Sequence, residues 1–220
     1  MIFPRSSGLQ GMQTFLNITM SVDGFVAGPN QTLEQPLGEG GENLHEWIVG
    51  LESWRRQHGL EGGEATADDE LVRQTHERSG AFVMGRRMFS GGDGPWEDDP
   101  NANGWWGDDP PFGAPVYVVT HHRREPLSLG ATTFTFVDGI KEAIRQARDA
   151  AGGRDVQLSG GASVAQQALN AGLLDELDIH VAPRLLGGGV RLFEEAGPRA
   201  IELQRVVASP HATHLVYAVG

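Results

Sequence analysis

Three clusters of glycine, arginine or histidine follow apolar segments of the sequence, and together they have the composition of a phosphate-binding site. Glycines let an anionic group approach the backbone without a Cβ in the way, and the free N–H groups at a helix start favour negative charge. Guanidinium groups can hold a further phosphate through forked hydrogen bonds. The clusters are Gly85-Arg86-Arg87, Thr120-His121-His122-Arg123 and Ser159-Gly160-Gly161-Ala162-Ser163.

The last cluster requires a strand that enters a helix through paired glycines. Residues 156–158 form a short apolar strand, and residues 162–170 show helical spacing of Val164, Ala165, Ala168 and Leu169. Gly172 is placed to end that helix in a left-handed conformation. A tight turn of purely steric origin is the alternative interpretation of the glycine pair.

The first two clusters also follow predicted strands, at residues 81–84 and 115–120. In an open parallel sheet, ligands bind outside the carboxyl ends of the strands. If the three strands are parallel, all three clusters lie on one rim and favour a phosphorylated dinucleotide. The alternative for each arginine is a solvated surface charge.

Further strands and helices alternate along the chain. This alternation predicts a mostly parallel sheet covered on both faces, with an antiparallel edge where the last strands lack helices between them. Residues 21–30 are expected to form a loop. Residues 91–112 form a long irregular segment whose three tryptophans, Trp96, Trp105 and Trp106, favour a functional loop. We predict further strands at 14–20, 132–137, 177–181, 203–209 and 213–219, and helices at 44–58, 68–78 and 139–151.

Composition excludes several classes of protein. The net charge of −12 argues against a nucleic-acid partner, since phosphate backbones require a basic surface. The absence of cysteine removes disulfides, thiolate metal sites and cysteine nucleophiles. No apolar run has the roughly 20 residues of a membrane span, and residues 1–11 lack the apolar core of a signal peptide. We therefore expect a cytoplasmic protein with a disordered leader at 1–11 and one domain at 12–220.

Motifs of other chemistries are missing. The run Gly187-Gly188-Gly189 lacks the third glycine and the helix of a dinucleotide fingerprint, and no P-loop or nucleophile elbow is present. The eight histidines show no spacing typical of metal ligands, so no metal is predicted.

Four motifs in order resemble the bacterial dihydrofolate-reductase-like family, which includes the C-terminal reductase domain of the bifunctional riboflavin-biosynthesis deaminase/reductase. The resemblance runs from about Met12 to the C-terminus. The motifs are Ser21-Val22-Asp23-Gly24-Phe25-Val26-Ala27-Gly28-Pro29-Asn30, Val83-Met84-Gly85-Arg86-Arg87-Met88-Phe89, Leu158-Ser159-Gly160-Gly161-Ala162-Ser163-Val164, and Pro183-Arg184-Leu185-Leu186-Gly187-Gly188-Gly189-Val190-Arg191-Leu192-Phe193.

The resemblance implies a dihydrofolate-reductase-like three-layer α/β/α sandwich that binds NADPH. It places the adenosine-side phosphates at the Gly-Arg motif, the 2′-phosphate at the cluster after the next strand, and the pyrophosphate at the glycine pair. The implied cofactor-binding residues are Thr19, Ala27, Gly28, Gly85, Arg86, Arg87, Met88, Thr120, His121, His122, Arg123, Ser159, Gly160, Gly161, Ala162, Ser163 and Val164.

The substrate side departs from the family pattern. The riboflavin reductases usually have a lysine in the first strand, where this chain has Asn17. Dihydrofolate reductase itself fixes its pterin with a carboxylate on its first helix, and here neither Glu46 nor Glu52 is placed by a motif. The deaminase half and its zinc motif are absent from this sequence.

These features predict an NADPH-dependent reductase that transfers a hydride to an unsaturated bond of a small, pterin- or pyrimidine-like substrate. Asp23 or an ordered water is the candidate proton donor. Asp23, Phe25, Trp96, Trp105 and Trp106 are the candidate substrate contacts, with one or more tryptophans acting as a lid over the nicotinamide.

The alternatives concern turnover and assembly. An NADP(H)-binding module without turnover would need the same cofactor site, and the tryptophans could equally pack the loop onto the body. The resemblance also points to a homodimer. The C-terminal edge of the predicted sheet is rich in apolar residues: Ile179, Leu185, Leu186, Val190 and Leu192.

Overall fold

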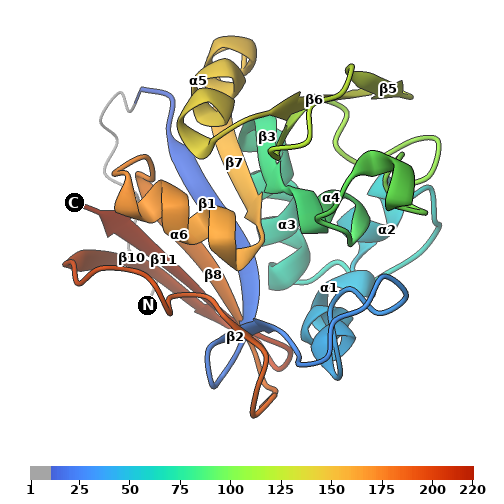
Figure 1. Ribbon diagram of the computed structural model, residues 1–220. Coiled ribbons are helices and arrows are strands. Elements are labelled where there is room, and N and C mark those ends of the chain that lie inside the picture. Colours follow the sequence, from blue (N-terminus) through green and yellow to red (C-terminus); the bar gives the residue numbers. More distant parts are fainter. Residues whose placement is uncertain (1–10) are drawn as a thin grey trace.

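The computed structural model describes residues 11–220 and centres on a nine-stranded sheet of order β10-β11-β8-β1-β7-β3-β4-β6-β5 (Figure 1). The leader predicted at 1–11 lies outside the described residues, apart from Gly11. The strands of this sheet are β1 Thr14–Ser21, β3 Ser79–Gly85, β4 Pro115–Val119, β5 Leu127–Leu129, β6 Thr132–Val137, β7 Asp155–Gly160, β8 Glu176–Ala182, β10 Ile201–Ala208 and β11 Thr213–Val219.

The six central strands β8, β1, β7, β3, β4 and β6 run parallel, and β5, β10 and β11 pair antiparallel at the two edges. The mostly parallel sheet with an antiparallel C-terminal edge is therefore confirmed. Helices α5 (Ile140–Ala150) and α6 (Ala162–Asn170) cover one face, and α3 (Ala67–Arg78) lies behind the sheet with the short helices η1 (Gly41–His45), α1 (Glu46–Val49) and α2 (Glu52–Gln57) (Figure 1).

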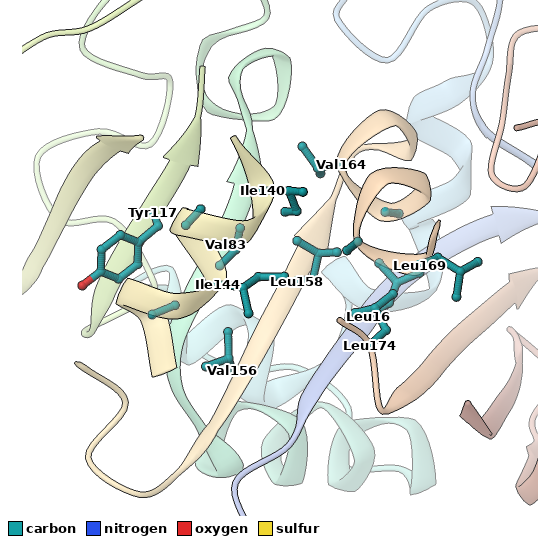
Figure 2. Packing of buried hydrophobic residues seen from close by; sticks show 14 of the residues in the cluster. Leu16, Val83, Tyr117, Ile140, Ile144, Val156, Leu158, Val164, Leu169 and Leu174 are labelled. Atoms are coloured by element: carbon teal, nitrogen blue, oxygen red, sulfur yellow. The ribbon is translucent and has the colours of Figure 1, made fainter. Parts of the chain in front are cut away.

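The largest core lies between the sheet and the helices α5 and α6 (Figure 2). Helix α5 buries Ile140, Ala143, Ile144 and Ala147, which the spacing i, i+3, i+4, i+7 places on one side. Leu158 of β7 is fully buried in the same cluster. Each large aliphatic side chain buried there stabilises the fold by about 1.5–3 kcal/mol. This core holds the glycine turn between β7 and α6 in place.

The structure corrects the prediction of one helix over residues 44–58. The chain instead forms η1, α1 and α2, because Leu51 is extended (φ −78°, ψ 144°) and bridges to Glu64. Trp47 and Leu51 still bury their side chains, so the apolar pattern marks the buried side but misses the break.

The loop predicted at residues 21–30 contains a short strand. Residues Phe25–Ala27 (β2) pair antiparallel with Val190–Arg191 (β9) in a second, two-stranded sheet. A strand of three residues is too short to give a periodic signal. Two further short helices are α4 (Arg86–Ser90) and η2 (Trp96–Asp98). None of the helices within residues 11–220 is long and apolar enough to cross a membrane.

Candidate functional site

The three clusters identified in the sequence lie on one rim of the sheet. Strands β7, β3 and β4 are neighbours and parallel, so their carboxyl ends meet at the same edge. A side chain added at Gly85 would place its Cβ 3.4 Å from Val164 Cγ1 and 3.7 Å from Gly161 N. A Cβ at Gly160 would lie 3.6 Å from Met88 Sδ. The end of β3 and the start of α6 therefore form one contiguous surface.

The glycine pair leaves the start of α6 open. The Gly160–Gly161 peptide bond is cis, and Gly160 has φ +118°, a conformation that favours glycine. Gly161 is the N-cap of α6 and provides no side-chain cap, and a Cβ on it would meet nothing within 4 Å. The backbone N–H groups of the first turn of this nine-residue helix can thus donate hydrogen bonds to an anionic ligand.

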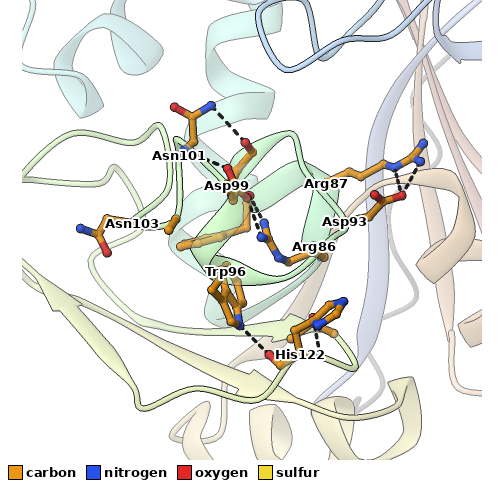
Figure 3. A network of polar contacts seen from close by, with 12 residues as sticks. Arg86, Arg87, Asp93, Trp96, Asp99, Asn101, Asn103 and His122 are labelled. Carbon is orange, nitrogen blue, oxygen red and sulfur yellow. Dashed lines mark hydrogen bonds and ion pairs between the residues drawn. The ribbon is translucent and has the colours of Figure 1, made fainter.

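The two arginines after β3 have different surroundings (Figure 3). Arg86 is buried, and its guanidinium pairs with Asp99 Oδ2 at 2.5 Å, bonds to Ser90 and stacks 3.6 Å over the Trp96 ring. Arg87 is 62% exposed, and its one ion pair among the described residues is with the similarly exposed Asp93. Arg87 can therefore turn to a ligand, whereas Arg86 would first have to leave a buried carboxylate.

Asp99 is a stable partner for Arg86. Burial raises the pKa of Asp99, but hydrogen bonds from Ser90 and Arg86 outweigh burial and hold the pKa below its usual value. The carboxylate therefore stays ionised at neutral pH. A buried ion pair of this kind is costly to break from one side.

Trp96 ties the long loop to the rim. Its indole Nε1 donates to His122 O at 2.7 Å (Figure 3). Its ring packs against Phe89 and Phe136. Arg124 bonds to Ala102 O in the same loop. The alternative that a tryptophan packs the loop onto the body thus describes Trp96.

The cluster after β4 combines a buried residue with exposed charge. Thr120 is buried and its Oγ1 accepts from His122 N at 3.1 Å, which shapes the turn. His121 lies at the surface beside Asp138, at 2.7 Å. Arg123 is exposed and forms no ion pair within residues 11–220. Arg123 and Arg87 are therefore the arginines at this rim that remain accessible to a phosphate.

A cavity of about 490 Å³ adjoins the rim through Ile18, Met88 and Ser159. Six aromatic side chains contribute to its walls, which suits a planar ligand because aromatic side chains stack on flat heterocycles. Trp105 and Trp106 line it, and Trp96 does not. The aromatic walls are Trp47, Trp54, Phe82, Trp105, Trp106 and Phe112.

The polar side chains that line the cavity are amides, hydroxyls and imidazoles. No carboxylate within the described residues lines it; its polar groups include Asn17, Thr19 and Gln157. Four histidines also line it: His45, His58, His76 and His180. Burial lowers the pKa of His45 and of His76, and it lowers the pKa of His180 to about 4. Sequence reasoning missed these histidines because they come from separate elements.

Asp23 and its neighbours lie outside the cavity. The Asp23 carboxylate accepts from Leu186 N at 3.1 Å and Gly187 N at 2.7 Å, and so joins the loop after β1 to the glycine run. A hydrogen bond from the Ser21 side chain, followed by these amides, lowers the pKa of Asp23 to about 2. Such a carboxyl carries no proton at neutral pH, so the geometry gives the predicted proton donor no support.

The other candidate ligand contacts in the first strand and its loop also pack against neighbouring parts of the protein. A Cβ at Gly28 would lie 1.9 Å from Glu39 O, so this glycine is required by the close approach of two backbones. Ala27 and Phe25 are buried in β2, where Arg191 lies 4.3 Å over the Phe25 ring. Thr19, the candidate cofactor contact in the first strand, does line the cavity, where it accepts from Trp47 Nε1 at 3.2 Å.

The family model of the RibD C-terminal domain matches residues 13–215. None of the proteins with curated functions matches the chain. Among solved structures, a protein from Shewanella sp. PV-4 described as belonging to riboflavin biosynthesis is 21% identical, with a TM-score of 0.62, and the match covers 95% of this chain and 99% of that one.

Two longer proteins show the same fold. The diaminohydroxyphosphoribosylaminopyrimidine deaminase/5-amino-6-(5-phosphoribosylamino)uracil reductase of Thermotoga maritima is 15% identical (TM-score 0.54), and the RibD of Acinetobacter baumannii is 15% identical (TM-score 0.58). The matches cover 96% of this chain, but only 57% and 58% of those proteins. The chain thus spans little more than half their length.

Proposed function

The chain belongs to the RibD C-terminal domain family, a family of reductase domains, and from that premise we propose that it is an NADPH-dependent reductase. It transfers a hydride to an unsaturated bond of a small, planar nitrogen heterocycle of the pterin or pyrimidine kind. The observation that carries the proposal is the position of the ring-lined cavity directly beside the glycine rim.

The residues of the rim suit a dinucleotide phosphate. The open first turn of α6 offers backbone N–H groups to a pyrophosphate, and Gly160 and Gly161 leave room for it. Arg87 and Arg123 would hold the 2′-phosphate, since Arg86 is engaged by Asp99. When bound, the nicotinamide supplies the hydride, and the protein orients the two rings and excludes water.

A spectrophotometric screen tests the proposal. Pterins, flavin precursors and small carbonyl compounds are offered with NADPH, and oxidation is followed at the nicotinamide absorbance. We expect turnover with at least one planar heterocycle. Binding of NADPH without oxidation by any compound would instead favour an NADP(H)-binding module, and failure to bind NADPH would contradict both.

The module without turnover has one observation in its favour. Within the described residues the cavity lacks a carboxylate, and Asp23, the expected acid, lies elsewhere. The histidines of the cavity are the remaining groups that can exchange a proton with a substrate.

We further propose that the protein acts in the cytoplasm as a homodimer. Ile179 and Leu192, named from the sequence, are buried in the protomer, whereas Leu185 is 75% exposed. The edge strand β10 adds exposed Leu203, Ile201 and Val206. An apolar edge strand is commonly covered in the assembled protein. Light scattering should give twice the 23.7 kDa of the chain, and a monomer at micromolar concentration would contradict it.

A further inference from the structure

A chain of buried polar side chains runs beneath the cavity and ends at its wall. Asp68 Oδ1 lies 3.1 Å from His214 Nε2, and His214 Nδ1 lies 2.8 Å from His180 Nδ1. His180 Nε2 then lies 2.9 Å from Asn17 Nδ2. Asp68, His214 and His180 are 0%, 2% and 6% exposed, so water does not compete for these bonds. Asn17 and His180 line the cavity.

The register of the sheet creates this chain. His214 of β11 pairs with His180 of β8, and Asn17 of β1 pairs with Asp178 two residues before His180. Residues two apart on a strand share a face, so these side chains lie on the side covered by α3. Trp47 packs over both imidazoles, with ring centroids 4.9 and 5.1 Å away.

The direction of each hydrogen bond follows from the carboxylate. Asp68 accepts, so His214 carries its proton on Nε2. Burial lowers the pKa of His214 and of His180, and each ring therefore has a single N–H at neutral pH. His214 Nδ1 must then accept from His180 Nδ1, which leaves the lone pair of His180 Nε2 to accept from Asn17.

The amide of Asn17 is oriented as a result. One Nδ2 hydrogen points to His180 Nε2, and the other points to Asp178 Oδ2 at 3.4 Å. Within residues 11–220 no hydrogen bond uses the Asn17 Oδ1. That oxygen is the remaining polar group with which Asn17 can meet a ligand.

We propose that Asp68, His214 and His180 are positioning residues that hold Asn17 with its Oδ1 toward the cavity, so that the cavity selects planar heterocycles with an N–H donor. The proposal rests on the proposed function in taking this cavity as the substrate site. An acceptor fixed in a ring-lined wall rejects a ligand without a donor, because such a ligand would cover the oxygen and leave it without a hydrogen-bond partner.

The first test reads the tautomers directly. Long-range ¹H–¹⁵N spectra of the labelled full chain at pH 7 distinguish protonated from bare imidazole nitrogens. We expect His214 protonated on Nε2 and His180 protonated on Nδ1. His180 protonated on Nε2, alone or on both nitrogens, would overturn the proposal, since Nε2–H would turn the Asn17 amide around.

The second test uses two probes, lumazine and 1,3-dimethyllumazine, which share a ring system and differ in N–H donors. Quenching of the cavity tryptophans reports binding. We expect lumazine to bind about tenfold more tightly than the dimethyl compound, the effect of one hydrogen bond. In Asn17→Leu the ratio should fall to about one, whereas a mere clash with the methyl groups would persist. Equal affinities in the parent protein, or no binding of lumazine, would overturn the recognition of donors.

A variant remote from the cavity isolates the positioning role. His214→Leu changes no cavity-lining residue, and we expect it to shift the His180 tautomer and to reduce the lumazine preference. Val216→Ala, on the same face of β11, is the matched control and should lower stability while leaving both readouts unchanged. If His214→Leu does not fold, the tautomers of His214 and His180 in the parent protein still test the proposed positioning role. Loss of NADPH oxidation would contradict the proposed function and leave these tautomers intact.

Discussion

The rim and the cavity of the candidate site are built from different materials. At the rim, backbone amides, glycines and exposed arginines form the surface, and the buried side chains behind them hold the loop. In the cavity, aromatic rings, Asn17 and His180 form the surface, and a buried chain of polar side chains supports it from behind. Ligand binding at the rim depends on the conformation of the backbone, whereas ligand binding in the cavity depends on the identity of the side chains. Substitutions should therefore separate stability from binding at the rim and alter selectivity in the cavity.

The largest effect is expected from removing the buried carboxylate behind the rim. Asp99→Ala leaves Arg86 buried and unpaired, which should lower the free energy of unfolding by about 3–5 kcal/mol. Asp93→Ala, which removes the exposed partner of Arg87, should change it by less than about 1 kcal/mol. Urea unfolding measures both. Equal losses of unfolding free energy in the two variants would contradict the difference in burial between the ion pairs of Arg86 and Arg87.

Acid should destabilise the cavity side of the molecule next most strongly. The pKa of His180 is about 4 in the folded protein, compared with 6.5 ordinarily. The unfolded chain therefore binds the proton first, and stability falls between pH 6.5 and 4 by on the order of 3 kcal/mol. The depressed pKa values of His45, His76 and His214 act in the same direction.

Urea unfolding at pH 7.5 and 5.0 checks this dependence. His180→Gln should flatten the pH slope, whereas His121→Gln, at a site 90% exposed, should leave it unchanged. A slope that survives His180→Gln would assign the dependence to other groups.

The preference for NADPH over NADH should be smaller, about 1–3 kcal/mol, and should depend on exposed arginines. Calorimetric titration of Arg87→Ala and Arg123→Ala should reveal which guanidinium supplies it. Arg86→Met, combined with Asp99→Leu so that no charge is stranded, should retain the preference. Equal affinities of the parent protein for the two cofactors would remove the 2′-phosphate assignment.

The smallest expected effects are those of replacing Trp105 and Trp96, two tryptophans of one loop with different roles. Trp105 lines the cavity and is 37% exposed, so Trp105→Ala should weaken lumazine binding by about 1 kcal/mol with an unchanged melting temperature. Trp96→Ala should instead lower the melting temperature and leave lumazine binding near the parent value. The opposite pattern would make Trp96 the ligand contact.

The rim was largely predictable from the sequence because its signals are local. A strand, a glycine and a helix follow one another within a few residues at Gly85 and at Gly160, and parallel neighbours bring such ends together. The buried ion pair of Arg86 was not predictable, because its partner Asp99 lies in an irregular loop without a periodic signal.

The cavity was not predictable, since it is assembled across distant segments. Asp68, His180 and His214 meet only through the register of β8 and β11 and the placement of α3. A weak signal existed in the strand 177–181, where Asp178 and His180 alternate with apolar residues that must be buried. Polar residues at alternate positions of an interior strand require partners, but the sequence does not identify them.

The position of β1 in the sheet has a consequence for how the chain reaches this state. Its neighbours β7 and β8 follow about 140 and 160 residues later, as the bonds from Gln13 N to Asp155 and from Thr14 N to Asp175 illustrate. During synthesis this apolar strand emerges long before either partner, and its closure of so large a loop places the fold among slow, high-contact-order topologies. Completion of the central sheet, and of the site at its edge, must therefore await translation of β8, with β1 open to chaperones until then.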